Sequence, residues 1–527
     1  MIFDYIIVGA GTSGCVLARN LSDAGASVLI LEAGPADRDP WIHIPLGIGK
    51  TIANPRVSEG FKSEPEPYAN NRRLGVPRGR VLGGSSSVNG LVYVRGNPRD
   101  YDRWAEQGAT GWAWKDVLPV YRRIEDFEGG ASELRGAGGP QHISWVRPNF
   151  PILNDLLTAA SQTGYPINPD YNGATQEGFG NAQAIIRNGR RQSAYRAWLH
   201  PIRHRNNLAI WTEAPVTKIL FEGKQAVGVA YRRDGKDQQI RCGKEVILAA
   251  GSIRSPGLLE LSGVGDAQRM QQLGIEVVHH LPGVGENLQE HFACFLKWKV
   301  HGTKTVNRSV RGLRAISEGM QYLFNRTGAL ALSAGPVMGF VKTRPDLTDC
   351  DVQYHATPMS FESPETRRLD KFDAITISSI AVRPQNRGSV HITSKDPNVP
   401  PRIQFNAFQY DEDVRTIARG LQIIRKIVGA KAMERYRPEE QGRSRELRTE
   451  DELCDYIRAN GNAAMHPVGS CRMGSGKDPM DVVDPKLDVT GLAGLRVIDA
   501  SMMPTLTSGN TMAPSLIIGA TGAERIE

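Results

Sequence analysis

The opening thirty residues constrain the fold most strongly, because they place a glycine-rich turn between two apolar strands. Tyr5 to Val8 is an apolar run that predicts a strand buried on both faces, and it breaks at Gly9. From Thr12 to Ala24 the apolar residues recur at helical spacing. A second apolar run, Val28 to Leu31, ends in the carboxylate of Glu32. This order predicts a βαβ unit of the dinucleotide-binding type.

The three glycines of this turn each answer a different steric requirement. Gly9 permits a tight turn, Gly11 has no Cβ to block a pyrophosphate, and Gly14 lets the helix pack close to the strand. The helix N-terminus directs unpaired N–H groups and partial positive charge at phosphate groups. Glu32 lies eighteen residues after Gly14 and can accept hydrogen bonds from ribose hydroxyls. We therefore predict an ADP-containing cofactor; the alternative is a glycine-rich turn in an ordinary α/β protein.

The composition fits a large globular protein. Of the 527 residues, 40% are hydrophobic and 23% are charged, and no apolar run reaches the roughly 18 residues of a membrane span. The first strand begins at once, without the basic and apolar regions of a leader. Six scattered cysteines form no CxxC pair, which favours a reducing compartment and argues against a disulfide framework or a metal site. We therefore expect a cytoplasmic protein without a transmembrane segment.

The net charge of +8 is the compositional hint of an anionic partner. However, the 64 lysines and arginines are spread along the chain and interleaved with 56 acidic residues, without aromatic–basic repeats. This pattern predicts a basic, solvated surface and no nucleic-acid binding.

Three later segments have the composition of loops and strand ends that approach a ligand. Residues 76–90 combine a Gly-Gly pair, three serines and Asn-Gly, so their backbone can come close to a flat or anionic group. Residues 244–251 are an apolar strand that ends in small residues, and residues 496–501 are a strand that delivers Asp499. Both strands predict a return of the chain to the sheet beside the cofactor.

In this order, these segments resemble the glucose–methanol–choline oxidoreductase family of flavoproteins, and most closely its bacterial choline-dehydrogenase-like alcohol dehydrogenases. The two specific patterns run from Gly79 to Asn89 and from Gly251 to Gly265, and the resemblance extends from Asp4 to about Gly522. It implies an α/β fold, with a Rossmann-type FAD-binding domain and an inserted α+β substrate-binding domain whose antiparallel sheet is covered by helices. The FAD-binding domain is expected to be discontinuous, with residues 1–150, 201–295 and 461–527, and the substrate-binding domain to take residues 151–200 and 296–460.

The sequence between residues 296 and 460 predicts a second region that contains both strands and helices. Short alternating runs at 374–380 and 388–393 predict antiparallel strands. Apolar residues at helical spacing between Phe405 and Met433 predict a helix. The polar, proline-rich residues 54–73 are expected to form a lid or interface loop.

The family resemblance implies FAD as the cofactor. Only one glycine-rich dinucleotide unit is complete, because Gly283-Val284-Gly285 lacks a third glycine, so electrons are expected to reach the flavin directly from the substrate. One subgroup of the family attaches FAD covalently through a histidine in the segment that here ends in Val88 and Asn89, so we predict non-covalent FAD. The cofactor-binding residues that the resemblance implies are Gly9, Gly11, Thr12, Ser13, Gly14, Glu32, Ala33, Arg80, Gly83, Gly84, Ser85, Asn89, Gly90, Val92, Val216, Ala250, Gly251, Asp499, Ala500, Asn510 and Met512.

The segment around His466 supplies the expected catalytic base. An imidazole with a pKa near neutrality can take up an alcohol proton as the hydride leaves the carbon. A lone histidine is more often structural, but the resemblance assigns His466 to the family's active-site base, and Pro467 would hold the turn that presents it. The implied partner is Asn510, whose amide can hydrogen-bond the substrate oxygen. Met512 stands where the family usually has asparagine, a change that is expected to alter pocket polarity.

Three further residues could reach a pocket, although packing is the expected role of each. They are Trp104, Tyr354 and His355.

We expect FAD-dependent oxidation of a primary alcohol to an aldehyde, by hydride transfer to flavin N5 with His466 as general base. The expected partners are a small-molecule alcohol and an electron acceptor, either a quinone or an artificial acceptor, with oxygen as the alternative. An oxygen-using alcohol oxidase of the same family, which produces hydrogen peroxide, is the nearest rival. A non-redox lyase or decarboxylase on the same scaffold is disfavoured because both His466 and Asn510 are present. Peripheral membrane association stays open beside the cytoplasmic location.

Overall fold

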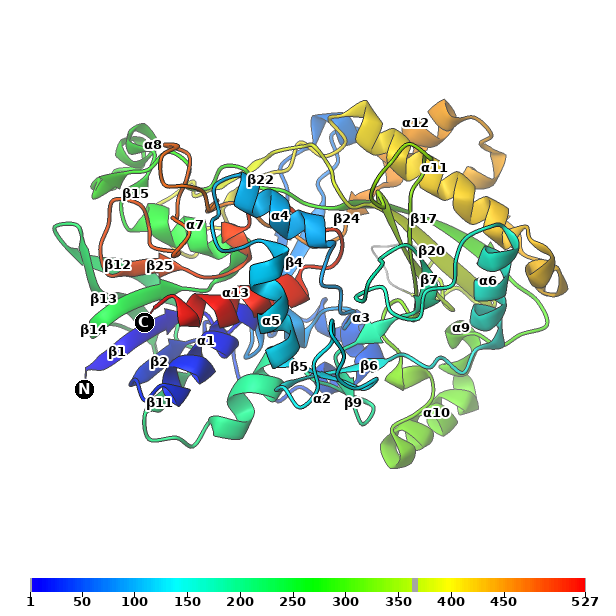
Figure 1. Ribbon diagram of the computed structural model, residues 1–527, viewed down its shortest axis with the longest axis horizontal. Helices are drawn as coiled ribbons and strands as arrows, with labels where there is room; N and C mark the ends of the chain where they lie inside the picture. Colours follow the sequence, from blue (N-terminus) through cyan, green and yellow to red (C-terminus); the bar gives the residue numbers. More distant parts are fainter. Residues whose placement is uncertain (1, 363–367, 527) are drawn as a thin grey trace.

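Two large sheets organise the chain, one mainly parallel and one antiparallel (Figure 1). A computed structural model describes residues 2–362 and 368–526. The mainly parallel sheet lies at the left of the view, near both chain termini, and the antiparallel sheet lies at the right. This is the predicted combination of a dinucleotide-binding sheet with a second α+β region.

The predicted βαβ unit forms the centre of the parallel sheet. Strand β1 (Phe3–Val8) leads through helix α1 (Thr12–Asp23) to β2 (Val28–Leu31). β1 lies between β2 and β14 and runs parallel to both. The apolar residues of β1 and β2 are buried, as expected for strands covered on both faces. The strand order is β11-β2-β1-β14-β13-β12, with β25 also paired to β14, and the further bounds are β11 (Leu208–Trp211), β12 (Val216–Glu222), β13 (Gln225–Arg233), β14 (Lys236–Leu248) and β25 (Leu495–Val497).

Strand β14 takes part in two kinds of pairing. Its first part pairs antiparallel with β13, and its last part runs parallel to β1 and β25. Because parallel strands end at one edge of a sheet, the segments that follow β1, β14 and β25 emerge side by side. This edge brings together Gly9, Ala250 and Asp499.

Glycines make the close approach at this edge sterically possible. Gly9 has a φ of +105°, and a Cβ on it would lie 2.5 Å from the carbonyl oxygen of Ala249. A Cβ on Gly14 would lie 2.0 Å from the carbonyl oxygen of Gly9. A Cβ on Gly84 would lie 2.7 Å from the Cα of Gly11. Helix α1 and the second glycine-rich loop can therefore pack against the first turn only with glycine at these positions.

The antiparallel sheet has the strand order β23-β17-β20-β19-β18-β7, with β24 also paired to β17. Helix α11 (Asp411–Val428) packs on this sheet. The hydroxyl of Ser379 in β20 donates to the carbonyl oxygen of Ile417 in α11 at 3.0 Å. The apolar residues that predicted this helix are buried. The strand bounds are β7 (Gly178–Asn181), β17 (Phe292–Lys299), β18 (Val337–Val341), β19 (Val352–Thr357), β20 (Ala374–Ala381), β23 (Glu439–Gln441) and β24 (Asn462–Ala463).

The antiparallel strand expected at residues 388–393 is confirmed: β21 (Ser389–His391) pairs antiparallel with β22 (Arg402–Gln404), outside the large sheet. One other local expectation was wrong in detail. The expected loop at residues 54–73 contains β3 (Ser58–Lys62), which pairs with β4 (Gly75–Gly79). The hairpin was not predicted because the polar side chains of this segment are typical of a loop.

The smaller elements connect and cover these sheets. In the figure, α11 and α12 lie together over the right-hand side, and the C-terminal helix α13 lies beside the parallel sheet (Figure 1). The remaining helices are α2 (Pro40–His43), α3 (Ile48–Thr51), α4 (Pro98–Glu106), α5 (Trp114–Ile124), α6 (Pro151–Gln162), α7 (Gly251–Leu261), α8 (Ala267–Gln272), α9 (Val306–Ser309), α10 (Gly312–Asn325), α12 (Glu450–Asn460) and α13 (Met512–Glu524). The remaining strands are β5 (Glu125–Phe127), β6 (Gln141–Trp145), β8 (Gln183–Ala184), β9 (Ile186–Arg187), β10 (Arg190–Arg191), β15 (Val264–Gly265) and β16 (His279–His280).

The expected domain boundaries stay a prediction. The antiparallel sheet takes β17 from Phe292 and β24 from Asn462, so its strands begin slightly inside the segments assigned to the FAD-binding domain.

Gly14→Ala should lower the thermal stability of the protein, because the added methyl group meets the backbone of Gly9 rather than a movable side chain. Forced overpacking of this kind costs about 1–3 kcal/mol. Gly319→Ala is the matched control: this helix position in α10 has open space around it, and the change should stabilise the helix by about 0.5–1 kcal/mol. Melting curves of the two variants and the parent test this contrast. A Gly14→Ala protein that melts with the parent would contradict the close packing.

Candidate active site

A cavity of about 900 Å³ opens at the carboxyl edge of the parallel sheet and extends to the antiparallel sheet. All of the expected cofactor-binding residues line it except Gly14 and Gly83. Gly14 packs against Gly9, and the N–H of Gly83 donates to the carbonyl oxygen of Ala10 at 2.8 Å, so both shape the wall from behind. Its size fits the range of about 300–1,000 Å³ typical of ligand and cofactor pockets.

The sheet edge has the donors and the space that an ADP-containing group requires. The first N–H groups of α1 have no partner within the helix and point toward the cavity at Thr12 and Ser13. The turn at Gly9 and Gly11 presents backbone without side chains. At the end of β2, Glu32 accepts from the N–H of Ala10 at 3.0 Å and from that of Gly34 at 2.8 Å. Burial raises the pKa of Glu32 to about 7.

Asp499 ties two of the converging segments together. It accepts from the N–H of Gly251 at 2.8 Å and from the hydroxyl of Ser255 at 2.5 Å. The start of α7 is therefore fixed against the segment that follows β25, and both line the cavity. This arrangement suits a flat, anionic cofactor that is held by backbone groups.

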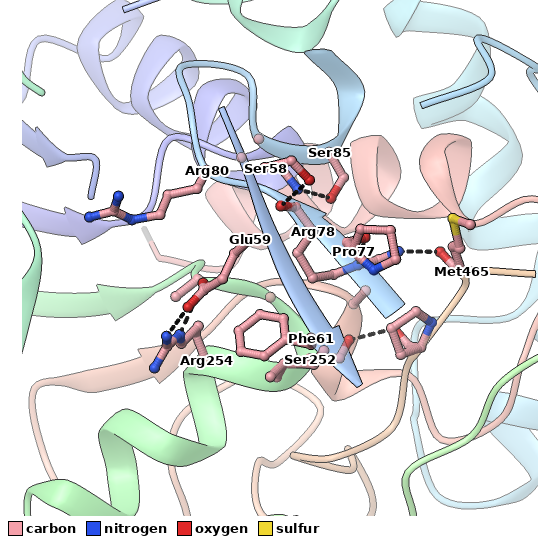
Figure 2. A pocket seen from close by; sticks show the side chains of 18 of the residues that line it. Ser58, Glu59, Phe61, Pro77, Arg78, Arg80, Ser85, Ser252, Arg254 and Met465 are labelled. Carbon is pink, nitrogen blue, oxygen red and sulfur yellow. Dashed lines mark hydrogen bonds and ion pairs between the residues drawn. The ribbon is translucent and has the colours of Figure 1, made fainter. Parts of the chain in front are cut away.

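The hairpin β3–β4 forms another wall of the cavity (Figure 2). Figure 2 shows Glu59 of β3 paired with Arg254, and Arg78 of β4 reaching the carbonyl oxygen of Met465. The Arg78–Met465 hydrogen bond is 2.7 Å long. Because Met465 directly precedes His466, Arg78 fixes the backbone at the predicted catalytic histidine.

His466 and Asn510 lie side by side on the cavity wall. The amide nitrogen of Asn510 is 2.9 Å from Nε2 of His466. The side chain of Gln353 donates to Oδ1 of Asn510 at 2.9 Å, so this oxygen is already occupied and the amide N–H₂ faces the imidazole. The structure therefore brings together the two residues that were predicted as a catalytic pair from segments forty-four residues apart.

A second histidine determines which nitrogen of His466 carries hydrogen. Nε2 of His291 is 3.1 Å from the carbonyl oxygen of Val382, which can only accept, so this nitrogen holds a hydrogen. Burial lowers the pKa of His291 to about 4, so its ring is neutral and its Nδ1 is bare. Nδ1 of His466 lies 3.1 Å from this bare nitrogen and must donate to it. Nε2 of neutral His466 is therefore unprotonated and accepts from Asn510.

Glu290 and Arg78 lie behind the two imidazoles. Oε1 of Glu290 accepts from the N–H of His466 at 2.6 Å and from that of His291 at 2.9 Å. Burial raises the pKa of Glu290 to about 8, and burial lowers the pKa of Arg78 to about 10. The cation of Arg78 lies close enough to His466 to lower its pKa.

The pKa of His466 is lowered well below its usual value. Burial is the largest cause, and His291, His355 and Arg78 add to it. His355 also lines the cavity, and burial lowers its pKa to about 4. All three imidazoles are therefore neutral at pH 7.

Sequence reasoning missed part of this site. Glu290 and His291 directly precede β17. No sequence spacing links them to His466, so only their position just before a strand could have indicated that they belong to the site. Gln353 and His355 alternate on β19, so a half-buried strand would have placed both on one face. The expectation that His355 could reach a pocket is confirmed, because it lines the cavity. Tyr354 and Trp104 do pack: both are buried, and they donate to the carbonyl oxygens of Gly420 and Thr505.

Within 2–362 and 368–526, no group of three or more histidine, cysteine, aspartate or glutamate side chains is placed to hold a metal ion. None of the helices in these ranges combines the length and apolar character that crossing a bilayer requires.

Solved structures share this architecture along the whole chain. Pyridoxine 4-oxidase from Mesorbium loti superposes with a TM-score of 0.89 at 27% identity, covering 99% of this chain and 98% of that one. An FAD-dependent oxidoreductase from Chaetomium thermophilum superposes with a TM-score of 0.88 at 26% identity, covering 99% of each chain.

Related sequences also align with this chain over nearly its full length. The oxygen-dependent choline dehydrogenase of Sinorhizobium medicae is 38% identical, with 99% of this chain and 95% of the relative covered. The mitochondrial choline dehydrogenase of Homo sapiens is 38% identical, with 100% and 90% covered. The GMC oxidoreductase family models match residues 3–293 and 384–519. The chain therefore belongs to the GMC oxidoreductase family and is an FAD-dependent oxidoreductase that acts on alcohol donors.

Proposed function

We propose that the protein oxidises a primary alcohol to an aldehyde, with His466 as the base that takes the hydroxyl proton and Asn510 as the donor that holds the alcohol oxygen. The observation that carries this proposal is the 2.9 Å contact between Nε2 of His466 and the amide nitrogen of Asn510 on the cavity wall. A decarboxylase, which acts on a carboxylate, would have no use for such a base–donor pair at a hydroxyl group.

The two side chains divide the work on the hydroxyl group. An alcohol oxygen that replaces the direct contact between the two side chains would accept from Nδ2 of Asn510 and donate to Nε2 of His466. Gln353 keeps the amide in this orientation, because it occupies Oδ1. As the α-carbon–hydrogen bond breaks, the hydroxyl proton moves to Nε2 of His466, and Asn510 stabilises the charge that develops on oxygen. Bound FAD would supply the acceptor for the hydride that leaves the carbon.

The surroundings of His466 keep it ready to accept a proton. Its lowered pKa means that the neutral form is populated at pH 7 and is lost only as the pH falls toward that lowered value. The Nδ1–H bond to His291 directs the lone pair of Nε2 at the cavity. His291 thus acts as a positioning residue for the base.

The residues that we propose to hold FAD follow from the sheet edge. Thr12 and Ser13 at the N-terminus of α1 suit the pyrophosphate, and Glu32 suits the ribose hydroxyls. The loop at Gly84 and Ser85 and the segment at Asp499 close the site from its other sides. In the proposed domain division, residues 1–150, 201–295 and 461–527 form the FAD-binding domain, and residues 151–200 and 296–460 form the substrate-binding domain.

We propose that the FAD is bound without a covalent link. Among the described residues that line the cavity there is no cysteine, tyrosine or lysine, and the histidines are His355 and His466. The 85–89 segment offers Val88 and Asn89, neither of which is a nucleophile. Oδ1 of Asn89 is held by the side chain of Arg191 at 2.7 Å.

The proposed function also includes an electron acceptor and a cellular location. We propose a quinone or artificial acceptor, with oxygen as the alternative, since the Sinorhizobium medicae relative is named oxygen-dependent. Hydrogen peroxide formed in air as fast as alcohol is consumed would favour the oxidase. The free cysteines support a reducing, cytoplasmic compartment, with peripheral membrane association as the alternative; the human relative is named mitochondrial.

His466→Ala should slow flavin reduction by a primary alcohol about 10²–10⁴-fold, because the base is removed. The flavin absorbance of the purified variant should match the parent, since His466 is not proposed to anchor FAD. His301→Ala, which removes an exposed ion pair with Glu439, is the matched control and should reduce at the parent rate. Anaerobic stopped-flow absorbance measures all three, and near-parent rates in His466→Ala would refute the assignment.

His291→Leu should lower the limiting rate of flavin reduction by about tenfold or more, because Nδ1 of His466 loses its acceptor and the ring can turn its bare nitrogen away from the alcohol. His291→Asn should retain most of the rate, since its Oδ1 can accept at the place of Nδ1. The rate of the parent should not fall as the pH is lowered through 6.5, the usual pKa of a histidine, because the pKa of His466 is lowered well below that value. Equal rates in the Leu variant and the parent would remove His291 from the mechanism.

Acid precipitation of the purified protein should release all of the flavin into the supernatant and leave a colourless pellet. A fluorescent protein band on an acid-treated denaturing gel would contradict non-covalent binding. The visible spectrum before precipitation gives the total flavin for comparison.

A further inference from the structure

The roof of the cavity is one face of the antiparallel sheet, and it carries no charge. Ala293 pairs directly with Ile380, and Phe295 and His355 both pair with Ser378. Residues directly opposite on neighbouring strands share a face, and all five line the cavity. His355 is neutral because burial lowers its pKa to about 4. Phe295 is 41% exposed at this face, so an apolar ring is accessible there.

The neighbouring walls continue this apolar lining. Ala463 and Ala464 precede His466, and both line the cavity. On another side, Gly90 faces Ala334 and Ile48: a Cβ on Gly90 would lie 2.9 Å from the Cβ of Ala334 and 4.0 Å from Cδ1 of Ile48. These parts of the cavity wall are thus formed by small aliphatic side chains.

Carboxylates do line the cavity, but each is engaged away from the catalytic pair. Glu32 receives backbone N–H groups at the end of β2, and Asp499 receives those of Gly251 and Ser501. Glu59 is paired with Arg254, and Asp396 lies in an exposed turn where it accepts from Asn398. These four are the carboxylates among the described residues of the lining.

A positive charge lies close to the base. Arg78 lies close enough to His466 to lower its pKa, and its hydrogen bond to Met465 holds it in place. Glu290 behind the pair does not offset this charge fully, since burial raises its pKa to about 8. A cationic ligand bound at His466 would therefore meet a like charge in a buried site.

Among its described residues, the lining also has few of the aromatic groups that bind quaternary ammonium ions. Such ions are recognised by cages of tryptophan, tyrosine and phenylalanine rings. Among the described lining residues the aromatic side chains are Phe61 on β3 and Phe295 on β17, and neither tryptophan nor tyrosine is present. Two separate phenylalanines do not make a cage.

We propose that the alcohol taken by this site is uncharged and apolar, not a quaternary-ammonium alcohol such as choline; this specificity rests on the proposed function of His466 and Asn510. It distinguishes the protein from the relatives that are named choline dehydrogenases. The roof of Ala293, Phe295 and Ile380 accepts the carbon skeleton, while the hydroxyl group reaches the catalytic pair.

The sharpest test compares choline with 3,3-dimethylbutan-1-ol, in which carbon replaces the charged nitrogen and the shape is kept. With the FAD-loaded protein, the neutral alcohol should reduce the flavin with at least about tenfold greater efficiency than choline. Binding is measured separately by calorimetry on dithionite-reduced protein, which cannot oxidise either alcohol. The neutral alcohol should bind at least about tenfold more tightly there.

A pair of variants tests the cause. Phe295→Glu places a carboxylate on the roof, and Phe295→Gln gives a side chain of the same size without charge. The Glu variant should shift the binding ratio about tenfold toward choline relative to the Gln variant. Flavin absorbance confirms that both variants fold and hold the cofactor.

The outcomes separate the two proposals. Choline that binds as tightly as its neutral isostere, or reduces the flavin as fast, overturns the substrate class and leaves the catalytic pair intact. Tighter binding of the neutral alcohol without any flavin reduction supports the substrate class and overturns the proposed oxidation. Equal ratios in the Glu and Gln variants overturn the electrostatic explanation of the preference.

Discussion

One carboxylate oxygen holds the two histidines of the site in register. Oε1 of Glu290 accepts the backbone N–H groups of both His291 and His466. These residues come from the start of β17 and from a loop 175 residues later in the chain. Because Oε1 is occupied by two donors, a proton taken up at the raised pKa resides on Oε2, and the double hydrogen bond survives either state of the acid. These two hydrogen bonds set the relative orientation of the two rings, and the tautomer of His466 depends on that orientation.

The two sheets contribute different chemistry to the same cavity. The parallel sheet offers backbone donors, glycine turns and a helix N-terminus, which suit a phosphate-containing cofactor of fixed shape. The antiparallel sheet offers side chains on alternate positions of β17, β19 and β20, which suit a variable substrate. His466 and Asn510 belong to the loops between the sheets. A family can therefore keep its cofactor site and change its substrate by replacing residues of the roof.

Sequence reasoning reached the parts of the fold that depend on local order. The βαβ unit was predictable because Gly9, Gly11, Gly14 and Glu32 lie within one short segment, and their spacing is itself the structure. The loops that follow residues 84, 251 and 499 were also predictable, through their resemblance to a family with a specific order of motifs. His466 and Asn510 were identified in this way, and the structure brings them within hydrogen-bonding distance.

The rest depended on strand pairing that no local pattern encodes. His291 and His355 are reached only through the register of β17, β20 and β19. The hairpin of β3 and β4 was hidden because its sequence is rich in proline and charge, and its partner strand lies thirteen residues beyond its end. Residues 388–393 had the right alternation for a strand but pair locally with β22. Alternation predicts a strand, whereas the sheet that it joins is decided by tertiary packing.

The double pairing of β14 also sets the order in which the molecule can be completed during synthesis. β1 gains its inner neighbour only when residues 242–248 have been made, and that neighbour gains β25 only near residue 495. The nascent amino-terminal half thus leaves the ribosome with an unsatisfied strand edge, which is a surface prone to aggregation and suited to chaperones. A truncated chain that stops before residue 495 lacks both the final strand of the nucleotide edge and Asn510, so premature termination removes part of the cofactor edge together with one member of the proposed catalytic pair.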